Sequence, residues 1–213
     1  MTRLALLIFS AALGSTLLGC GSNATSATAD PVSLVPASSA LSAGWSVDTT
    51  NNPSGQPMVA TTKVQAVNLI DGAASPFYKT YTPTEFVEQN YVNKTLPFAP
   101  PGDPNANPQG ATAIVYIWEM PSADQAAGLY QSLLDESEYS GNWQTTQPPL
   151  GTESRIEDTK TQWWVNFHEG VFYAEVFLNP SFGSKANGYA PSDPDLKNEA
   201  MKFAEAIANN PKL

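Results

Sequence analysis

A single cysteine, Cys20, closes an apolar N-terminal run and carries the clearest chemistry in this sequence. Arg3 supplies a positive start, residues 4–18 form the apolar centre, and the small residue Gly19 precedes the cysteine. This order is typical of a signal segment that is removed after export. A lone thiol cannot form an internal disulfide, and acylation would consume it. The pattern therefore predicts cleavage before Cys20 and transfer of fatty acyl chains such as palmitate to this residue.

The same segment predicts where the protein resides. It looks like a bacterial lipoprotein signal, and it falls short of the roughly 20 apolar residues that a spanning helix needs. Several acyl chains hold a protein firmly, so we expect a cell-envelope protein that is lipid-anchored and does not cross the membrane. Gly21 rather than Asp follows the cysteine, which favours the outer membrane in a bacterium with two membranes. In a bacterium with one membrane, we expect the protein on the outer face of the cell membrane. The alternative is an incidental thiol in an ordinary secretory signal.

The sequence has few residues that could bind a metal ion or carry out redox chemistry. One histidine and one cysteine exclude a His-rich site, a thiolate zinc site and a Cys-x-x-Cys redox pair. Asp103, Asn105 and Asn107 have the spacing of the first three positions of a calcium loop. Pro108 stands where the turn glycine belongs, and Ile114 stands where the bidentate glutamate belongs. We therefore predict no metal site and no cofactor.

Catalytic groups are equally sparse. A Gly-x-Ser-x-Gly motif is absent, and nothing in the sequence places a serine beside His168. The acidic pairs Glu157/Asp158 and Glu169/Glu175 have the residue type of glycosidase carboxylates. Acidic residues are normally solvated, and the separation that a glycosidase needs does not follow from the sequence. We predict no catalytic residue and expect that the protein is not an enzyme.

The charge balance excludes one class of partner. The chain has 10 Lys+Arg against 20 Asp+Glu, and removal of the signal takes away one basic residue, Arg3. Nucleic-acid binding draws its affinity from basic side chains, so we expect no nucleic-acid partner. Anionic lipid headgroups are repelled for the same reason. The acyl chains, rather than the protein surface, must therefore hold the protein at the membrane.

Composition divides the chain into segments. After the signal at residues 1–19, residues 20–39 are rich in Ser, Ala and Thr and predict a flexible tether. Residues 40–213 predict a single globular domain, because 42% hydrophobic residues suffice for one core. Within it, residues 96–110 (LPFAPPGDPNANPQG) are proline-rich and predict a surface loop.

Two periodicities alternate within the domain. Apolar residues at helical spacing predict a short helix around residues 67–77, and Val-, Ile- and aromatic-rich runs predict strands at 86–92 and 111–120. Ser122 and Gln125 form a capping box that begins a helix reaching about residue 136, and Asp193-Pro194 begins a last helix. The buried faces expected for these two helices are Ala126, Leu129, Leu133 and Leu196, Ala200, Phe203, Ile207. The sequence thus predicts an α+β fold in which a largely antiparallel sheet packs with about three α-helices.

Residues 162–168 and 171–178 predict a β-hairpin joined by Glu169-Gly170. This turn would pair residue 163 with 176, 165 with 174 and 167 with 172. The core face of the hairpin would contain Trp163, Val165, Phe167, Phe172, Ala174 and Val176. The opposite face carries Trp164 and Tyr173, whose flat rings would suit sugar rings or apolar ligands if that face is exposed. Trp164 and Tyr173 are therefore the candidate ligand-binding residues.

The order of several short motifs resembles an uncharacterised group of bacterial exported proteins. The motifs are Leu34-Val35-Pro36, Gly44-Trp45, residues 68–74 (NLIDGAA) with Tyr78 and Tyr81, and residues 115–130 (VYIWEMPSADQAAGLY). The group is described only as a domain of unknown function, and the resemblance covers residues 34 to about 209. Asp71 stands where the group has asparagine, and Pro76 and the 96–110 insertion also depart from its pattern. The resemblance implies a fold and an exported location and carries no catalytic residue.

Two functions remain open. The first is a non-catalytic envelope lipoprotein whose domain has a structural role or binds an envelope protein, and we favour it because the anchor, the tether and the acidic domain agree with it. The second is binding of a small ligand or a glycan through Trp164 and Tyr173. A cavity between the sheet and a helix would favour ligand binding, whereas a flat apolar patch would favour a protein partner.

Overall fold

The computed structural model describes residues 29–50, 52–70, 80–96, 111–135, 143–158, 163–179 and 193–213. The strands are β1 (Trp45–Val47), β2 (Met58–Ala60), β3 (Glu85–Asn93), β4 (Ala111–Glu119), β5 (Gln144–Thr145), β6 (Glu153–Asp158), β7 (Trp163–Glu169) and β8 (Phe172–Asn179). The helices are the 3-10 helices η1 (Pro31–Leu34) and η2 (Ser38–Ala40) and the α-helices α1 (Lys63–Leu69), α3 (Ala123–Asp135) and α4 (Asp193–Ala208). The predicted signal with Cys20, residues 71–79 of the predicted first helix and residues 97–110 of the predicted loop lie outside the described residues.

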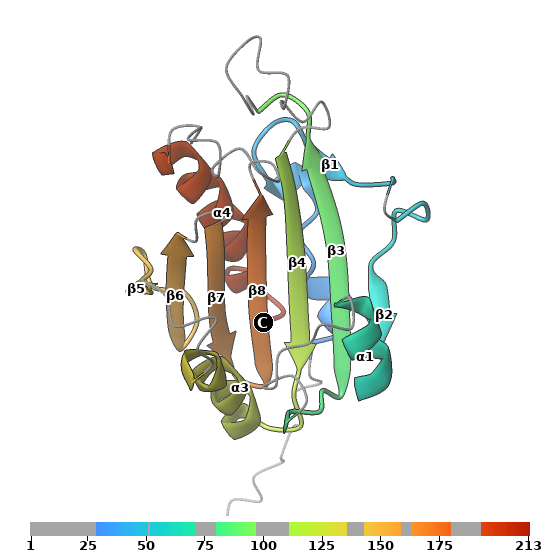
Figure 1. Cartoon of the computed structure of the whole chain (residues 1–213), viewed down its shortest axis with the longest axis vertical. Coiled ribbons are helices and arrows are strands. Elements are labelled where there is room, and N and C mark those ends of the chain that lie inside the picture. The colour runs from blue at the N-terminus through green and yellow to red at the C-terminus, as the bar shows by residue number, and fades with distance from the viewer. Residues whose placement is uncertain are drawn as a thin grey trace, which may run out of the picture.

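The described strands form one antiparallel sheet (Figure 1). Their order is β1-β3-β4-β8-β7-β6-β5, and β2 pairs with the part of β3 that β1 does not reach. This arrangement confirms the predicted α+β fold with an antiparallel sheet. Thr80 is helical in addition to α1, α3 and α4, so the helices number about four rather than about three.

Helices cover both faces of the sheet. In Figure 1, α4 lies behind the sheet, whereas α1 and α3 lie on the near side. We call these the α4 face and the α3 face. The α4 face includes Tyr91, Val115, Val165, Phe167, Val176, Leu178, Leu196, Phe203 and Ile207. The α3 face includes Phe86, Trp118, Leu129, Tyr130, Trp164 and Tyr173. Every residue of β7 from Trp163 to His168 is buried, so the sheet has an apolar core on each side.

Local signals explain where the helices begin. The Ser122 hydroxyl accepts a hydrogen bond from the Gln125 backbone N–H at 3.2 Å, which confirms the predicted start of α3. The predicted buried face of α4 is confirmed as well, since Leu196, Ala200, Phe203 and Ile207 are at most 3% exposed. The first helix begins earlier than predicted, because Thr62 caps α1 by accepting from the Gln65 N–H at 3.3 Å. Among the described residues, none of the helices has the length and apolar character that a membrane crossing requires.

The folded part of the chain begins before the predicted tether ends. Leu34 of η1 is 0% exposed and belongs to the core of the α4 face. The hydroxyl of Tyr91 on β3 donates to the backbone oxygen of Pro36 at 2.6 Å. The predicted tether boundary at residue 39 is therefore wrong. The Ser- and Ala-rich composition of this segment predicted a tether, but its apolar residue Leu34 packs in the core and fixes the segment on the sheet.

The predicted hairpin has the correct faces and an incorrect register. The structure pairs Trp163 with Leu178, Val165 with Val176 and Glu169 with Phe172. The loop is therefore residues 170–171, because Gly170, with φ of 53°, takes the first turn position and not the second. The pairing shifts by two residues, and a shift of two leaves every side chain on its predicted face.

Candidate functional site

Trp164 and Tyr173, the candidate ligand-binding residues, lie on the α3 face and are buried. Their exposed fractions are 2% and 0%. The Trp164 ring stacks on that of Phe177 with centroids 4.7 Å apart, and the Tyr173 ring lies 6.4 Å from that of Tyr130 on α3. The sequence left open whether this face is exposed or covered, and the structure shows it covered, because α3 packs on this side of the hairpin and makes it a second core. Neither residue presents a flat face to a ligand.

A row of polar side chains crosses the same face. The strand register places Glu88, Tyr116, Glu175, Asn166 and Arg155 opposite one another on β3, β4, β8, β7 and β6. Burial raises the pKa of the Glu88 carboxyl above its ordinary value. Within the described core, Glu88 Oε2 and Asn166 Nδ2 have no hydrogen-bond partner. Buried polar atoms without partners are costly and mark places where water or a ligand completes the hydrogen bonding.

Arg155 ends this row and is held in one orientation. It is 5% exposed, its Nε donates to Asn166 Oδ1 at 2.8 Å, and its Nη2 donates to the backbone oxygen of Tyr130. The guanidinium carbon lies 4.0 Å from the ring centroid of Tyr130 and 4.7 Å from that of Trp143. Burial lowers the pKa of Arg155, but a guanidinium stays charged at neutral pH. The cation thus lies within cation–π distance of two aromatic rings.

Arg155 lines a groove between α3 and the edge of the sheet. Two adjoining pockets of about 370 and 260 Å³ make up this groove. They share four residues, Tyr130, Thr145, Glu153 and Ser154. The remaining lining residues are Gln131, Trp143, Gln144, Arg155, Pro149 and Thr152. We call this feature the Arg155 groove. It lies between a helix and the sheet, which is the arrangement that favours ligand binding.

The structure places several of the other chemical groups that the sequence singled out. His168 is 7% exposed, its ring packs 5.1 Å from that of Tyr130, and burial lowers its pKa, so that it is neutral at pH 7. Glu157 on β6 and Glu175 on β8 are buried, and β7 lies between these two strands. Asp103, Asn105 and Asn107 lie outside the described residues. Groups of three or more potential metal-binding side chains are absent from the part of the chain that the structure describes.

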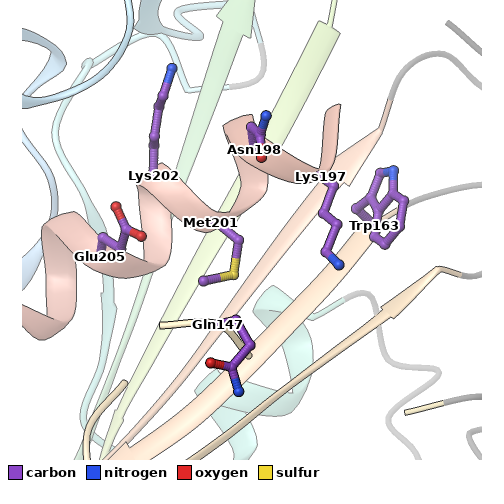
Figure 2. Close-up of a pocket in the computed structure, with 7 residues that line it drawn as sticks. All are labelled: Gln147, Trp163, Lys197, Asn198, Met201, Lys202 and Glu205. Atoms are coloured by element: carbon purple, nitrogen blue, oxygen red, sulfur yellow. The ribbon is translucent and has the colours of Figure 1, made fainter. Parts of the chain in front are cut away.

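A larger pocket of about 640 Å³ lies beside α4 (Figure 2). Lys197 extends along the ring of Trp163, with its Nζ 5.9 Å from the ring centroid, and Met201 points toward Gln147. Lys202 points away from Gln147 and bonds to Glu199 and Ser42. The buried lining residues are Trp163 and Met201, and the charged ones are at least partly exposed. This pocket therefore lacks the buried, oriented cation that distinguishes the Arg155 groove.

Sequence reasoning overlooked Arg155, Tyr130 and Trp143. The neighbourhood of these residues arises from α3, β5 and β6, and neither short strand was predicted. One signal was present, because Arg155 is the only arginine of the chain apart from Arg3 in the predicted signal. A single arginine in an acidic domain is a candidate for a specific structural or binding role.

No protein-family model matches this chain, and neither the curated proteins nor the solved structures contain a match. The resemblance to the group of exported proteins stays a prediction.

Proposed function

We propose that this chain is a lipid-anchored protein of the bacterial cell envelope whose domain binds a ligand or partner without transforming it. The sequence pattern around Cys20 supplies the anchor, and the fold supplies a reason to expect close attachment. Ala29 already packs against the core of the α4 face. The nine residues from Cys20 to Ala29 span at most about 30 Å when fully extended. The short distance from Cys20 to the folded part is the observation that carries this proposal, since it keeps the domain beside the membrane.

Binding without catalysis agrees with the lining of the Arg155 groove. Among the described residues that line it, Glu153 is the one carboxylate, whereas glycoside hydrolysis uses a pair. The hydroxyl of Ser154 is engaged with Thr146 at 2.6 Å and with the Leu150 N–H at 2.9 Å. It is therefore committed to the loop and is not presented as a nucleophile.

A protein partner, the function that the sequence favours, stays a prediction. Large apolar docking patches usually mark such surfaces. Within the described residues, the exposed large apolar side chains are Val59 and Val64. The Arg155 groove is a larger and more specific feature than these two exposed valines, and this favours a ligand over a protein partner.

Replacement of Cys20 tests the anchor. The substitution Cys20→Ser should move the protein from the membrane fraction to the soluble fraction or leave the signal uncleaved, because serine cannot be acylated as this cysteine is. Detergent-phase partitioning and mass spectrometry of the N-terminus would measure this. Ser22→Ala, two residues away, should leave membrane attachment unchanged. A wild-type protein that is fully soluble with an unmodified Cys20 would contradict the proposal.

A further inference from the structure

We propose that the Arg155 groove binds a neutral oligosaccharide. This inference rests on the proposed function, a binding domain held at the membrane, and names the site and the chemical class of its ligand.

The first step is the fixed orientation of the Arg155 guanidinium at the groove. A guanidinium has five N–H donors in a fixed plane. The structure uses one donor on Nε and one on Nη2, toward Asn166 and Tyr130. The other N–H groups belong to the same side chain, which lines the groove. Because two rings and two hydrogen bonds fix the guanidinium, its remaining donors are oriented before a ligand arrives, which lowers the entropic cost of binding.

The second step is the charge of the lining. Its two charged residues are Arg155 and Glu153, one of each sign. An anionic ligand on Arg155 would meet Glu153 and the field of a chain with formal charge −10. A cationic ligand would meet Arg155. A ligand without net charge, which both accepts and donates hydrogen bonds, avoids both penalties.

The third step is the chemistry of the remaining lining. Thr145 provides a hydroxyl and Gln144 an amide. The Thr152 hydroxyl donates to Glu169 at 2.8 Å and the Gln131 amide to Glu153 at 2.9 Å, so these two groups offer their oxygens as acceptors. Tyr130, Trp143 and Pro149 provide apolar surface. This combination matches a sugar, whose hydroxyls bond to polar groups and whose C–H faces pack on aromatic and proline rings. The two pockets adjoin, so the groove suits a chain of sugar units rather than a single one.

Titration of the lipidated, detergent-solubilised protein with chitohexaose, an uncharged hexasaccharide, tests the inference by calorimetry. We expect a Kd of about 1 mM or tighter. Gln144 and Thr145 are exposed rim residues, so the double variant Gln144→Ala/Thr145→Ala should keep its melting temperature and weaken binding at least about tenfold, the equivalent of about 1.4 kcal/mol. The matched control Gln147→Ala, at an exposed residue of the pocket beside α4, should leave the affinity unchanged.

Charged oligosaccharides of similar length separate the ligand classes. A hexamer of galacturonic acid and a hexamer of glucosamine should each bind more weakly than chitohexaose. Tighter binding of either charged hexamer would overturn the assignment of a neutral ligand. Absence of binding by chitohexaose, cellohexaose and maltohexaose, or equal affinity in the groove double variant, would overturn the saccharide site. These results leave membrane attachment untouched, since fractionation of the Cys20→Ser variant reports on it separately.

Discussion

Two adjacent tryptophans on β7 point to opposite faces of the sheet, and each lies in a core. Trp163 is 9% exposed on the α4 face, and Trp164 is 2% exposed on the α3 face. Replacing a buried tryptophan by alanine leaves a cavity, so Trp163→Ala and Trp164→Ala should each lower the free energy of unfolding by about 3–5 kcal/mol. Urea titration followed by circular dichroism would measure both losses.

The comparison is informative because the two residues are neighbours in sequence. If Trp164 formed an open aromatic platform, Trp164→Ala would cost little stability and Trp163→Ala would cost much. Val59→Ala, at a residue that is 46% exposed, provides a control that should change stability by less than about 1 kcal/mol. A Trp164→Ala variant as stable as this control would contradict the two-sided burial described above.

At the scale of elements, two turns of the sheet depend on glycine for different reasons. Gly151 and Gly170 have nearly equal positive φ values, 54° and 53°. A Cβ on Gly170 would meet nothing within 4 Å, whereas a Cβ on Gly151 would lie 2.6 Å from the backbone oxygen of His168. Gly170→Ala should therefore lower the free energy of unfolding by about 1–2 kcal/mol, which is the cost of placing alanine in a left-handed conformation. Gly151→Ala should lower the free energy of unfolding by more, because the backbone oxygen of His168 must also move.

Chemical denaturation of the two glycine variants would give this difference directly. The shared φ makes Gly170→Ala the matched control for Gly151→Ala. Equal losses would show that the backbone at Gly151 relaxes freely, contrary to the close approach between the loop before β6 and the end of β7.

The elements that the sequence predicted were those with strong local signals. The run at 111–120 is rich in β-branched and aromatic residues and became β4 (Ala111–Glu119), and the capping residue Ser122 marked the start of α3. β1, β2 and β5 have two or three residues each, too few for a periodic pattern. β6 has a single apolar residue, Ile156, and therefore no alternating pattern, and it is a strand because β7 pairs with it. Pairing with neighbouring strands therefore makes β1, β2, β5 and β6 strands, where the local sequence pattern does not predict them.

At the scale of the whole molecule, Glu199 connects the first and last parts of the described chain. Its Oε2 accepts from Trp45 Nε1 at 2.8 Å, and its Oε1 accepts from Ser42 Oγ at 2.9 Å and from Lys202 Nζ at 3.0 Å. Burial alone would raise the pKa of Glu199, but these hydrogen bonds and the Lys202 charge lower it below its ordinary value of 4.5. A depressed pKa means that the ionised carboxyl stabilises the fold above pH 4.5 and that this stabilisation is lost as the pH falls through the lower folded value.

Glu199→Gln should therefore lower the free energy of unfolding at pH 7 by about 1 kcal/mol, after allowance for solvent screening at a partly exposed site. At a pH below the lowered pKa of Glu199, where the wild-type carboxyl also becomes protonated, the two proteins should approach equal stability. Urea titrations at the two pH values would show this. Glu205→Gln on the same helix is the control and should have little effect at either pH. A Glu199→Gln deficit that persists unchanged at low pH would contradict the role of the charge.

The candidate site is a property of the whole molecule, and the sequence could not predict it. Arg155 contacts Tyr130 from α3 and Trp143 from the segment before β5, and the polar row behind it crosses five strands. Adjacent members of that row are separated in sequence by 9 to 59 residues, as for Asn166 and Glu175 or Tyr116 and Glu175. Only the strand register brings them together. The burial of Trp164 was unpredictable for the same reason, because the helix that covers it, α3, lies elsewhere in the chain.

The position of the N-terminal segment has a mechanical consequence. A pull on the proposed lipid anchor would act first on residues 29–44, which lie on the α4 face. They are retained by Leu34, by the Tyr91 hydroxyl on Pro36, by the Asn210 side chain on the Ser33 oxygen and by the Ser42 hydroxyl on Glu199. None of these contacts belongs to the pairing of β3, β4, β8 and β7. Their release would lengthen the link by roughly 50 Å. In a protein anchored as proposed, these residues would act as an extensible spacer, and tension at the membrane would change how far the domain reaches.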